Sequence, residues 1–514
     1  MYSVKTGDSA LRAKKDLQGA YILTAMREHF LNGDAYIMSD ELYGICKEAR
    51  KGISFDLLHA DAQHLLRTGK LHREGRRLYI HGTWAFEEDA SKRIAEVLKS
   101  NPLIPSYIPE QLNANGCALD EEQRAAVVMA LSHRLSLILG GAGCGKTTLI
   151  HAIAQYGKSG VLVCAPTGKA AQNLKERINL PARTVHSVLG IGYEDDDAPL
   201  PPVKWRYINT VIIDEASMLT IGLLDGVLSK VTEDCNVVLV GDPEQLPSVG
   251  SGNVIPDLIE LGLPHICLHT NHRQSEKSLA LYHNVVHFDC ITDLKHLALD
   301  ESFSLIRVDT LDQTLSEVTK QAVLLLGEEA DFQVLAARNS IVDRLNRSIQ
   351  NAWNPRRSGM QTIKYKGKEF RSGDKVIITK NDSRRNCWNG DIGVIVILVG
   401  DEATDKSCDY QYGVMLNDGR FPKWLGTDAL EHLELAYAIT IHKAQGSQFD
   451  NVLMPASMSR MLCRNLFYTA VSRARRSVTI YGSENAVHVA LQTQIRLRRS
   501  MLVQKTRLLL ERTA

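Results

Sequence analysis

A glycine-rich stretch at residues 140–148 holds the first side chains that could do chemistry, and it reads Gly-Gly-Ala-Gly-Cys-Gly-Lys-Thr-Thr. An apolar run at residues 135–139 precedes it, and a helix-like segment at residues 149–155 follows it. Glycines let successive backbone N–H groups point into a phosphate-sized hollow, and the N-terminus of the helix adds positive potential there. Lys146 would reach the β- and γ-phosphates of a nucleotide, and Thr147 would hold Mg²⁺.

The alternative for this stretch is a glycine-rich turn that binds nothing, which the flanking strand and helix disfavour. We therefore expect it to form the phosphate loop of an ATP site. The loop residues expected to contact the nucleotide are Gly141, Ala142, Gly143, Cys144, Gly145, Lys146, Thr147 and Thr148.

An acidic pair, Asp214 and Glu215, follows another apolar run at residues 210–213. Hydrolysis of a magnesium–nucleotide complex needs such a pair, because one carboxylate holds the metal with its water shell and another polarises the attacking water. We assign the first role to Asp214, together with Thr147, and the second to Glu215. The pair could instead cap the N-terminus of a helix. Gln245 follows the apolar run at residues 236–240 and is a candidate sensor of the γ-phosphate.

The elements that must position these residues follow an alternating pattern of strands and helices. Apolar runs separated by helical stretches predict a parallel sheet covered on both faces, with the catalytic loops at the carboxyl ends of its strands. The predicted strands cover residues 135–139, 160–165, 210–213 and 236–240, and a second set covers residues 304–308, 332–336, 437–441 and 478–481. The fold class expected is α/β with two such halves.

Composition sets limits on the kind of protein. A chain of 514 residues predicts several domains, and 44% hydrophobic with 23% charged residues is typical of a globular protein. The net charge of +1 argues against a protein that coats DNA, so that any nucleic-acid contact must rest on a local groove. Ten scattered cysteines and the lack of a signal peptide or long apolar segment lead us to expect a soluble cytoplasmic protein with reduced thiols.

Further motifs occur in a fixed order along the chain. They lie at residues 165–171, 184–186, 214–218, 241–250, 271–274, 437–447 and 467–474. Together with the phosphate loop, this set of eight resembles the RecD-like branch of superfamily 1 helicases. The resemblance covers roughly residues 119 to 483, and eight motifs in one order are far more specific than any one of them.

The resemblance implies roles for residues that spacing alone does not identify. Gln123 would read adenine, Gly446 and Gln448 would contact the nucleotide, and Arg273 and Arg473 would reach the γ-phosphate from across a cleft. Either arginine could instead form a structural ion pair, and the nearby Arg475 leaves the choice of Arg473 open. Ala444 stands where the family commonly has serine. Gln448 stands where it commonly has glutamate, and because an amide lacks that charge we expect weaker nucleotide affinity but not inactivity.

A groove for a single strand is implied by the same resemblance. Thr184 and His186 could instead be a helix cap and a core histidine, an alternative that the residues themselves leave equal. The expected DNA-binding residues are Pro166, Thr167, Lys169, Thr184 and His186 on the first half, and Thr440, His442 and Lys443 on the second.

The expected domain organisation combines the motifs with the composition of the segments around them. A helix–hairpin pattern near the N-terminus resembles a winged-helix module, which could contact DNA or pack against its neighbours. Tyr193 and Trp205, in an insertion that the family uses to split duplexes, could stack on a base or simply pack, while Arg384, Arg385 and Trp388 could contact a backbone. The domains expected are an N-terminal helical, winged-helix-like domain (1–105), a first RecA-like motor domain (106–268) with a hairpin insertion (190–208), a second RecA-like motor domain (269–372 and 435–490), an SH3-like barrel insertion (373–434) and a basic C-terminal helix (491–514).

The function expected is an ATP-dependent DNA helicase that uses ATP and Mg²⁺ and moves 5′ to 3′ along single-stranded DNA. Its expected partners are single-stranded DNA and junctions of single- and double-stranded DNA, with no membrane, and we expect a monomer. The direction and the preference for DNA rest on the resemblance alone. The alternatives are a superfamily 1 RNA helicase and an ATP-gated binding or remodelling module with little unwinding. A P-loop small-molecule kinase is disfavoured by the motifs of the second half.

Overall fold

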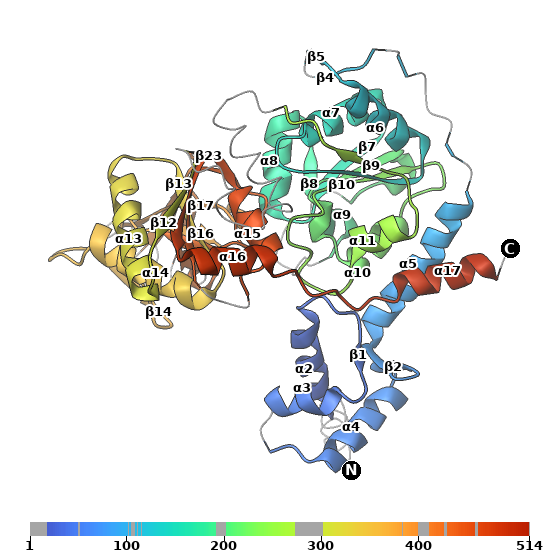
Figure 1. Cartoon of the computed structure of the whole chain (residues 1–514), viewed down its shortest axis with the longest axis horizontal. Coiled ribbons are helices and arrows are strands. Elements are labelled where there is room, and N and C mark those ends of the chain that lie inside the picture. The colour runs from blue at the N-terminus through green and yellow to red at the C-terminus, as the bar shows by residue number, and fades with distance from the viewer. Residues whose placement is uncertain are drawn as a thin grey trace, which may run out of the picture.

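The computed structural model describes residues 18–49, 52–100, 102–103, 108–109, 111–114, 116–191, 202–272, 302–382, 384–398, 411–425, 429–457 and 461–512. Two α/β bodies lie side by side, and a smaller N-terminal body projects from beneath them (Figure 1). Within the described residues, no helix is both long and apolar enough to cross a membrane.

The first α/β body is built on a six-stranded parallel sheet with the order β11-β6-β10-β9-β7-β8. Its central strands are buried on both faces. In β6, Leu137 and Leu139 pack toward α10 and α11, whereas Ile138 between them packs toward α6 and α7. The strands are β6 (Leu135–Gly140), β7 (Val161–Ala165), β8 (Ala182–Thr184), β9 (Thr210–Ile213), β10 (Asn236–Gly241) and β11 (His265–Leu268). The helices are α6 (Glu121–Ser132), α7 (Lys146–Tyr156), α8 (Gly168–Ile178), α9 (Val185–Leu189), α10 (Ile221–Leu228) and α11 (Val254–Glu260).

The second α/β body has a five-stranded parallel sheet with the order β12-β23-β22-β13-β21. Its long strand β22 (Phe449–Ala456) lies between β23 and β13, yet it is absent from the strands that the sequence predicts. The other strands are β12 (Phe303–Arg307), β13 (Phe332–Ala336), β21 (Ala438–Thr440) and β23 (Ala474–Gly482). Helices α13 (Leu311–Gly327) and α14 (Asn339–Trp353) pack on one face, and α15 (Arg464–Val471) and α16 (Glu484–Gln492) on the other.

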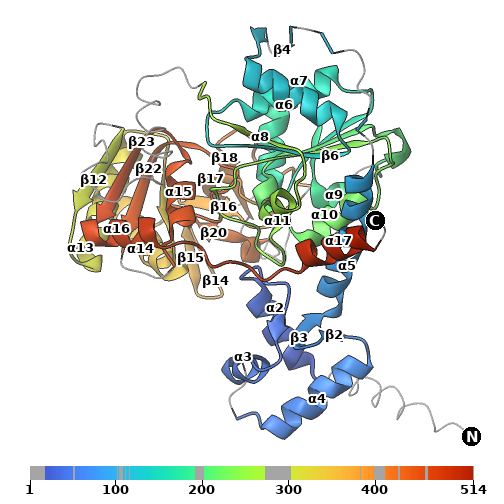
Figure 2. The same ribbon diagram turned by 45° about the vertical axis from the view of Figure 1, so that its right-hand side comes forward.

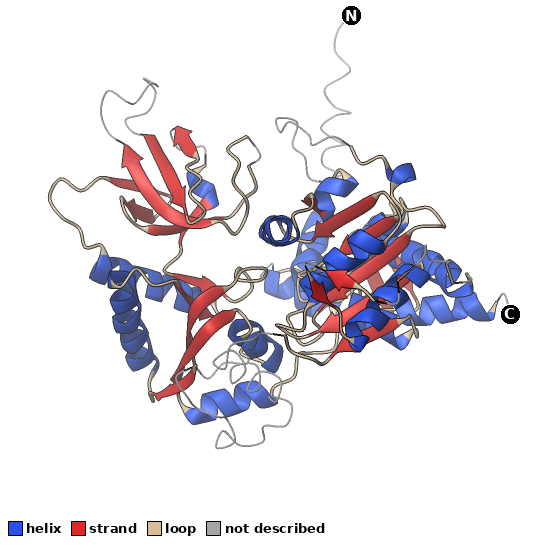
Figure 3. Ribbon diagram, turned by 90° about the horizontal axis from the view of Figure 1, so that it is seen from above, coloured by secondary structure: helices blue, strands red, loops and turns tan. Residues whose placement is uncertain are grey.

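A small antiparallel barrel is inserted into the second body, and Figure 3 shows its strands as a group separate from the two larger sheets. Ile363 and Phe370, from the hairpin of β14 and β15, are buried in the core of the barrel. The predicted start of the barrel at residue 373 is therefore too late, because the preceding hairpin supplies part of its core. The strands are β14 (Thr362–Tyr365), β15 (Lys368–Arg371), β16 (Lys375–Ile378), β17 (Ile392–Leu398), β18 (Gln411–Leu416), β19 (Lys423–Leu425) and β20 (Leu433–Leu435).

In its described part, from residue 18 onward, the N-terminal body combines helices α2, α3 and α4 with a three-stranded sheet of order β1-β3-β2. Strands β2 and β3 form the hairpin that the sequence predicts, and Gly75 at its turn has a φ of 59°, which favours glycine. A long helix, α5 (His81–Lys99), leads from this hairpin to the first α/β body (Figure 2). The other elements are α2 (Ala20–Phe30), β1 (Ile37–Met38), α3 (Leu42–Ala49), α4 (Phe55–Arg67), β2 (Leu71–Glu74) and β3 (Arg77–Ile80), followed after α5 by the short pair β4 (Asn113–Ala114) and β5 (Cys117–Ala118).

The C-terminal segment departs from the helix predicted over residues 491–514. After α16 the chain runs without helix through residues 493–501, and only then forms α17 (Leu502–Glu511), which packs against α5 (Figures 1 and 2). The prediction is wrong for the first part because the arginines there bind fixed partners on other bodies: Arg496 and the backbone N–H of Arg499 contact Asp34, and Arg498 contacts Ser248.

Candidate nucleotide site and nucleic-acid groove

The phosphate loop connects β6 to α7. Gly143 and Gly145 have φ values of 90° and 76°, in the left-handed region that favours glycine, so the loop can curl as the sequence predicts. A Cβ atom on Gly145 would lie 2.5 Å from Nε2 of Gln123, which shows how closely that side chain approaches the loop. Lys146 donates hydrogen bonds from Nζ to the carbonyl oxygens of Gly141, at 2.8 Å, and of Gly140. The side chain of Lys146 therefore lies along the phosphate loop, where it is predicted to contact the nucleotide phosphates.

Gln123 belongs to a capping box at the start of α6. Its backbone N–H donates to Oδ1 of Asp120 at 2.7 Å, and its Oε1 accepts from the backbone N–H of Asp120 at 3.3 Å. His272 closes the same corner, because its backbone N–H donates to the carbonyl of Gly143 and its ring pairs with Asp120 at 3.0 Å. Sequence reasoning singled out Gln123 and missed the contribution of Asp120, although the Asp-x-x-Gln spacing is a capping-box signature.

The acidic pair lies at the carboxyl end of β9. Burial, followed by repulsion from Glu215, raises the pKa of Asp214 above its ordinary value, while Lys146 and Arg177 lower it. Glu215 has a φ of 49°, a left-handed conformation that costs a non-glycine residue free energy and is concentrated at functional sites. Glu215 stands at the N-cap position of a short 3-10 turn, Ala216–Met218, but its side chain makes no cap hydrogen bond, so it does not cap the turn.

A small cavity lies where the two α/β bodies meet. It is lined by Thr147, Asp214 and Glu215 from the first body and by Gly446, Gln448 and Arg473 from the second, with Ala170, Asn173, Leu174 and Arg177 of α8 between them. A hydroxyl and two carboxylates at one place are the hard oxygen donors that Mg²⁺ prefers, so the residues present fit that ion. Residues more than 200 positions apart in the sequence thus share one polar site.

Arg473 and Arg475 lie in different positions relative to the cavity. Arg473 is 4% exposed, lines the cavity, and donates to the carbonyl of Thr469 and the hydroxyl of Ser472. Arg475 pairs with Asp331 at 3.4 Å and with Asp450 at 3.6 Å, and does not line this cavity. Ion pairs thus hold Arg475, whereas the side-chain bonds of Arg473 go to a carbonyl and a hydroxyl.

Helix α8 supplies two residues of the cavity that sequence reasoning missed. Arg177 donates from Nη2 to Oε1 of Gln448 at 2.9 Å, and Asn173 donates from Nδ2 to the carbonyl of Gly446 at 2.6 Å. Both bonds cross from the first body to the second. Their spacing of four residues places Asn173 and Arg177 on one face of the helix, which is the signal that could have found them.

Among the predicted catalytic residues that the structure describes, Lys146 and Gln245 do not line the cavity. Gln245 is 5% exposed, donates to Oδ2 of Asp242 at 3.1 Å, and does not line the cavity. Its neighbour Leu246 donates from the backbone to Oγ1 of Thr469 at 3.0 Å, so that its loop contacts α15 of the second body. Arg273 lies outside the described residues.

The predicted DNA-binding residues of the first body divide into structural and exposed ones. Pro166 is buried, Thr167 caps α8 by accepting from the backbone of Ala170, and Thr184 caps α9 by accepting from the backbone of Ser187. For Thr184 the alternative of a helix cap therefore holds. His186 is exposed, so the alternative of a core histidine is wrong.

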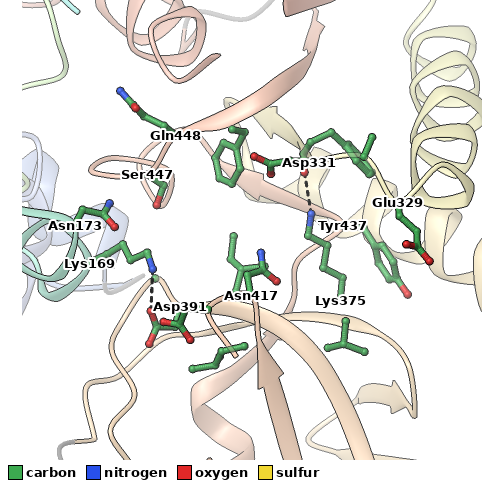
Figure 4. Close-up of a pocket in the computed structure, with 18 of the residues that line it drawn as sticks. Lys169, Asn173, Glu329, Asp331, Lys375, Asp391, Asn417, Tyr437, Ser447 and Gln448 are labelled. Carbon is green, nitrogen blue, oxygen red and sulfur yellow. Dashed lines mark hydrogen bonds and ion pairs between the residues drawn. The ribbon is translucent and has the colours of Figure 1, made fainter. Parts of the chain in front are cut away.

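The two lysines of the predicted groove are held in ion pairs. Lys169 pairs with Asp391 of the barrel at 3.2 Å, and Lys443 pairs with Glu434. Thr440 accepts from the backbone of Lys443, and the side chain of His442 is exposed. Figure 4 shows Lys169 and Asp391 pointing toward each other at the edge of a pocket of about 890 Å³ between α8, the barrel and the second body.

The barrel reaches the first body through its loop at residues 381–391. A Cβ atom on Gly168 would lie 2.9 Å from Asn381 and 3.4 Å from Trp388, so this loop packs on the start of α8. Arg385 pairs with Asp382 within the loop. In the insertion at residues 190–208, Trp205 packs against the core of the first body, which favours the packing alternative, while Tyr193 lies outside the described residues.

These features place the chain in the class of P-loop helicases. Family models match an AAA domain at residues 118–298, a UvrD-like helicase C-terminal domain at residues 435–481 and an ATP-dependent RecD-like DNA helicase SH3 domain at residues 345–409. The RecBCD enzyme subunit RecD of Mycolicibacterium smegmatis is 31% identical over 472 residues, which cover 81% of this chain and 80% of that protein. The chain belongs to the RecD family, which confirms the resemblance and the SH3-like insertion predicted from the sequence.

The chain is also similar to two further helicases. The ATP-dependent RecD2 DNA helicase of Deinococcus radiodurans is 33% identical over 401 residues, which cover 76% of this chain and 52% of that protein. Among solved structures, Bacteroides Pif1 bound to single-stranded DNA is 20% identical with a TM-score of 0.46, covering 77% of this chain and 98% of that one.

Proposed function

We propose that this protein is an ATP-dependent DNA helicase whose two α/β bodies are RecA-like motor domains that move 5′ to 3′ along single-stranded DNA. The observation that carries this proposal is the cavity shared by Thr147, Asp214 and Glu215 on one body and Arg473 on the other. Because residues of both bodies complete the site, a bound nucleotide would draw the two bodies together, and their closure would depend on it. A single-body ATPase would have no need of the second set of residues.

The roles of the residues follow from their chemistry. Lys146 and the backbone of the phosphate loop hold the phosphates, and Thr147 and Asp214 would hold Mg²⁺, which neutralises phosphate charge when bound. Glu215 orients and deprotonates the attacking water. Arg473 offers a planar, permanently charged donor to the γ-phosphate and stabilises the negative charge that develops in transfer.

The path proposed for the single strand runs over α8 and the segment after β21. Lys169 and Lys443 would exchange their carboxylate partners for phosphates, and the exposed His186 and His442 would add contacts that do not depend on sequence. The barrel loop that packs on α8 would lie beside this path. The N-terminal body, with its helices and β-hairpin, is proposed to be a winged-helix module.

ATP turnover with and without single-stranded DNA tests the proposal. We expect DNA to stimulate hydrolysis by the wild-type protein, and we expect Lys146→Ala to abolish turnover because the phosphates lose their main cationic partner. Unwinding of matched DNA and RNA duplexes with 5′ or 3′ overhangs then tests substrate and direction. ATP turnover that single-stranded DNA does not stimulate, or unwinding of RNA duplexes only, would contradict the assignment.

A further inference from the structure

Residues 493–501, which we call the strap, connect three bodies of the molecule. The strap leaves α16 of the second body, where the carbonyl of Thr493 accepts from the backbone N–H of Arg464 at 2.9 Å. It then passes beneath the first body and ends at α17, which lies along α5 (Figure 2). Its function is not explained by the nucleotide site or by the proposed groove.

Arg498 is the best-anchored side chain of the strap. Its Nη1 donates to the hydroxyl of Ser248 at 3.0 Å and to the carbonyls of Gly250 at 3.3 Å and Gly252 at 2.9 Å, and its Nη2 donates to the carbonyl of Ser248. The guanidinium fits against Gly33, where an added Cβ atom would lie 2.2 Å from Nε. A cation that is withdrawn from water and donates several hydrogen bonds to one loop fixes the position of that loop.

The neighbouring arginines tie the strap to the N-terminal body. Arg496 and the backbone N–H of Arg499 both bind Asp34, which is 2% exposed, and the guanidinium of Arg499 also pairs with Glu41. The backbone of Gly252 donates to the carbonyl of Gly33 at 3.0 Å. The loop at residues 241–252, the strap and the N-terminal body therefore meet at one junction.

The other end of the same loop contacts the second body beside the nucleotide cavity. Leu246 donates to Oγ1 of Thr469, and Asp242 accepts from the hydroxyl of Tyr468 at 3.0 Å. The carbonyl of Thr469 in turn accepts from Nε of Arg473. The hydrogen bonds of Arg498 to Ser248, the short backbone segment from Ser248 to Leu246 and the hydrogen bonds of Thr469 thus link the strap to Arg473, which lines the cavity.

We propose that Arg498 is a positioning residue that holds the loop at residues 241–252 in register, and that the strap thereby couples closure of the two α/β bodies to the N-terminal body. The loop touches α15 at one end and the strap at the other, so movement of the second body displaces both ends. With Arg498 in place, the loop transmits this displacement to the strap. Without Arg498, the loop deforms and the strap does not move with it. This inference rests on the proposed motor function.

The test compares the ratio of ATP turnover with single-stranded DNA to turnover without it. We expect Arg498→Gln to lower this ratio at least fivefold while turnover without DNA changes less than twofold. The ratio is independent of the fraction of folded protein, so simple loss of structure would not change it. Arg507→Gln is the matched control: Arg507 lies on α17, is half-exposed and, among the residues that the structure describes, pairs with Glu260 alone, and we expect the variant to keep the wild-type ratio.

Arg498→Lys keeps the inference testable if Arg498→Gln does not fold. Lysine retains the charge, but a single ammonium group cannot span the carbonyls of Ser248 and Gly252, so we expect a ratio reduced at least twofold. A full wild-type ratio in a folded Arg498 variant would overturn the inference and leave the motor function intact. A wild-type protein that DNA does not stimulate would instead refute the motor function on which it rests.

Discussion

At the scale of single residues, the cavity distinguishes two arginines that lie two positions apart. Arg473 is buried beside Asp214 and Glu215, whereas Arg475 is half-exposed and held by Asp331 and Asp450. An arginine that stabilises charge in phosphoryl transfer contributes far more than an exposed ion pair, because it acts in a site from which water is excluded.

We therefore expect Arg473→Ala to lower kcat for ATP in the presence of DNA by about a thousandfold, the scale of a lost arginine finger. Arg475→Ala is the matched control and should change kcat by less than about threefold, as an exposed ion pair would. Steady-state ATP hydrolysis measures both. A larger loss in Arg475→Ala than in Arg473→Ala would reverse the assignment.

At the scale of elements, the docking of α17 on α5 depends on a buried acid. Glu87 is 0% exposed, and its Oε1 accepts from the backbone N–H of Met501 and the hydroxyl of Ser500. Burial raises the pKa of Glu87 to about 7, and burial likewise raises the pKa of Asp257 on the adjacent α11 to about 6. Both carboxyl groups therefore remain protonated up to a higher pH in the folded chain than in the unfolded one.

The sign of the pH dependence follows from this difference. The unfolded chain releases the Glu87 proton near 4.5 and the folded chain near 7, so the folded state binds more protons between these values. The free energy of unfolding should therefore fall as the pH rises through this window, by at most about 3 kcal/mol for Glu87. Urea unfolding midpoints should be lower at about pH 8 than at about pH 5, and Glu87→Gln should flatten the trend. Asp89→Asn, an exposed acid on the same helix, should leave it unchanged.

At the scale of the whole molecule, the proposed groove crosses both α/β bodies. Lys169 stands on the first body and Lys443 on the second, and each is paired with a carboxylate of the segment that includes the barrel. When a lysine binds a phosphate of DNA, a counterion is released from the DNA. Replacing that lysine by an uncharged residue therefore reduces the salt dependence of DNA binding.

We expect Lys169→Met and Lys443→Met each to reduce the slope of log affinity against log salt concentration by about 0.7, the value for one single-strand phosphate contact. The double variant should lose about twice that amount. Fluorescence anisotropy of labelled single-stranded DNA at several potassium chloride concentrations measures the slope. Lys230→Met is the control, because Lys230 is exposed and precedes β10, at the amino-terminal edge of the first sheet and away from the groove. Unchanged slopes in all variants would exclude this path.

The sequence by itself determined the features whose causes are local. The phosphate loop, the acidic pair after β9 and the hairpin of β2 and β3 depend on glycine conformations, apolar runs and turn residues that are neighbours in the chain. Four strands of the first sheet, β6, β7, β9 and β10, were predicted within a residue or so for the same reason, since they are buried and each run is apolar. Strands β8 and β11 were not predicted, because their residues are more exposed and do not form an apolar run.

Only the tertiary structure decided which residues from distant parts of the chain meet. The choice of Arg473 over Arg475, the bonds from Asn173 and Arg177 to the second body, and the extended strap held by Arg498 all depend on partners more than 200 positions away. The basic residues of the strap have a helical spacing, but hydrogen bonds to Ser248 and Asp34 outweigh that weak local preference. Contacts between distant residues leave no periodic pattern in the sequence. Each of them depends on two side chains and not on the residues adjacent to them in the chain.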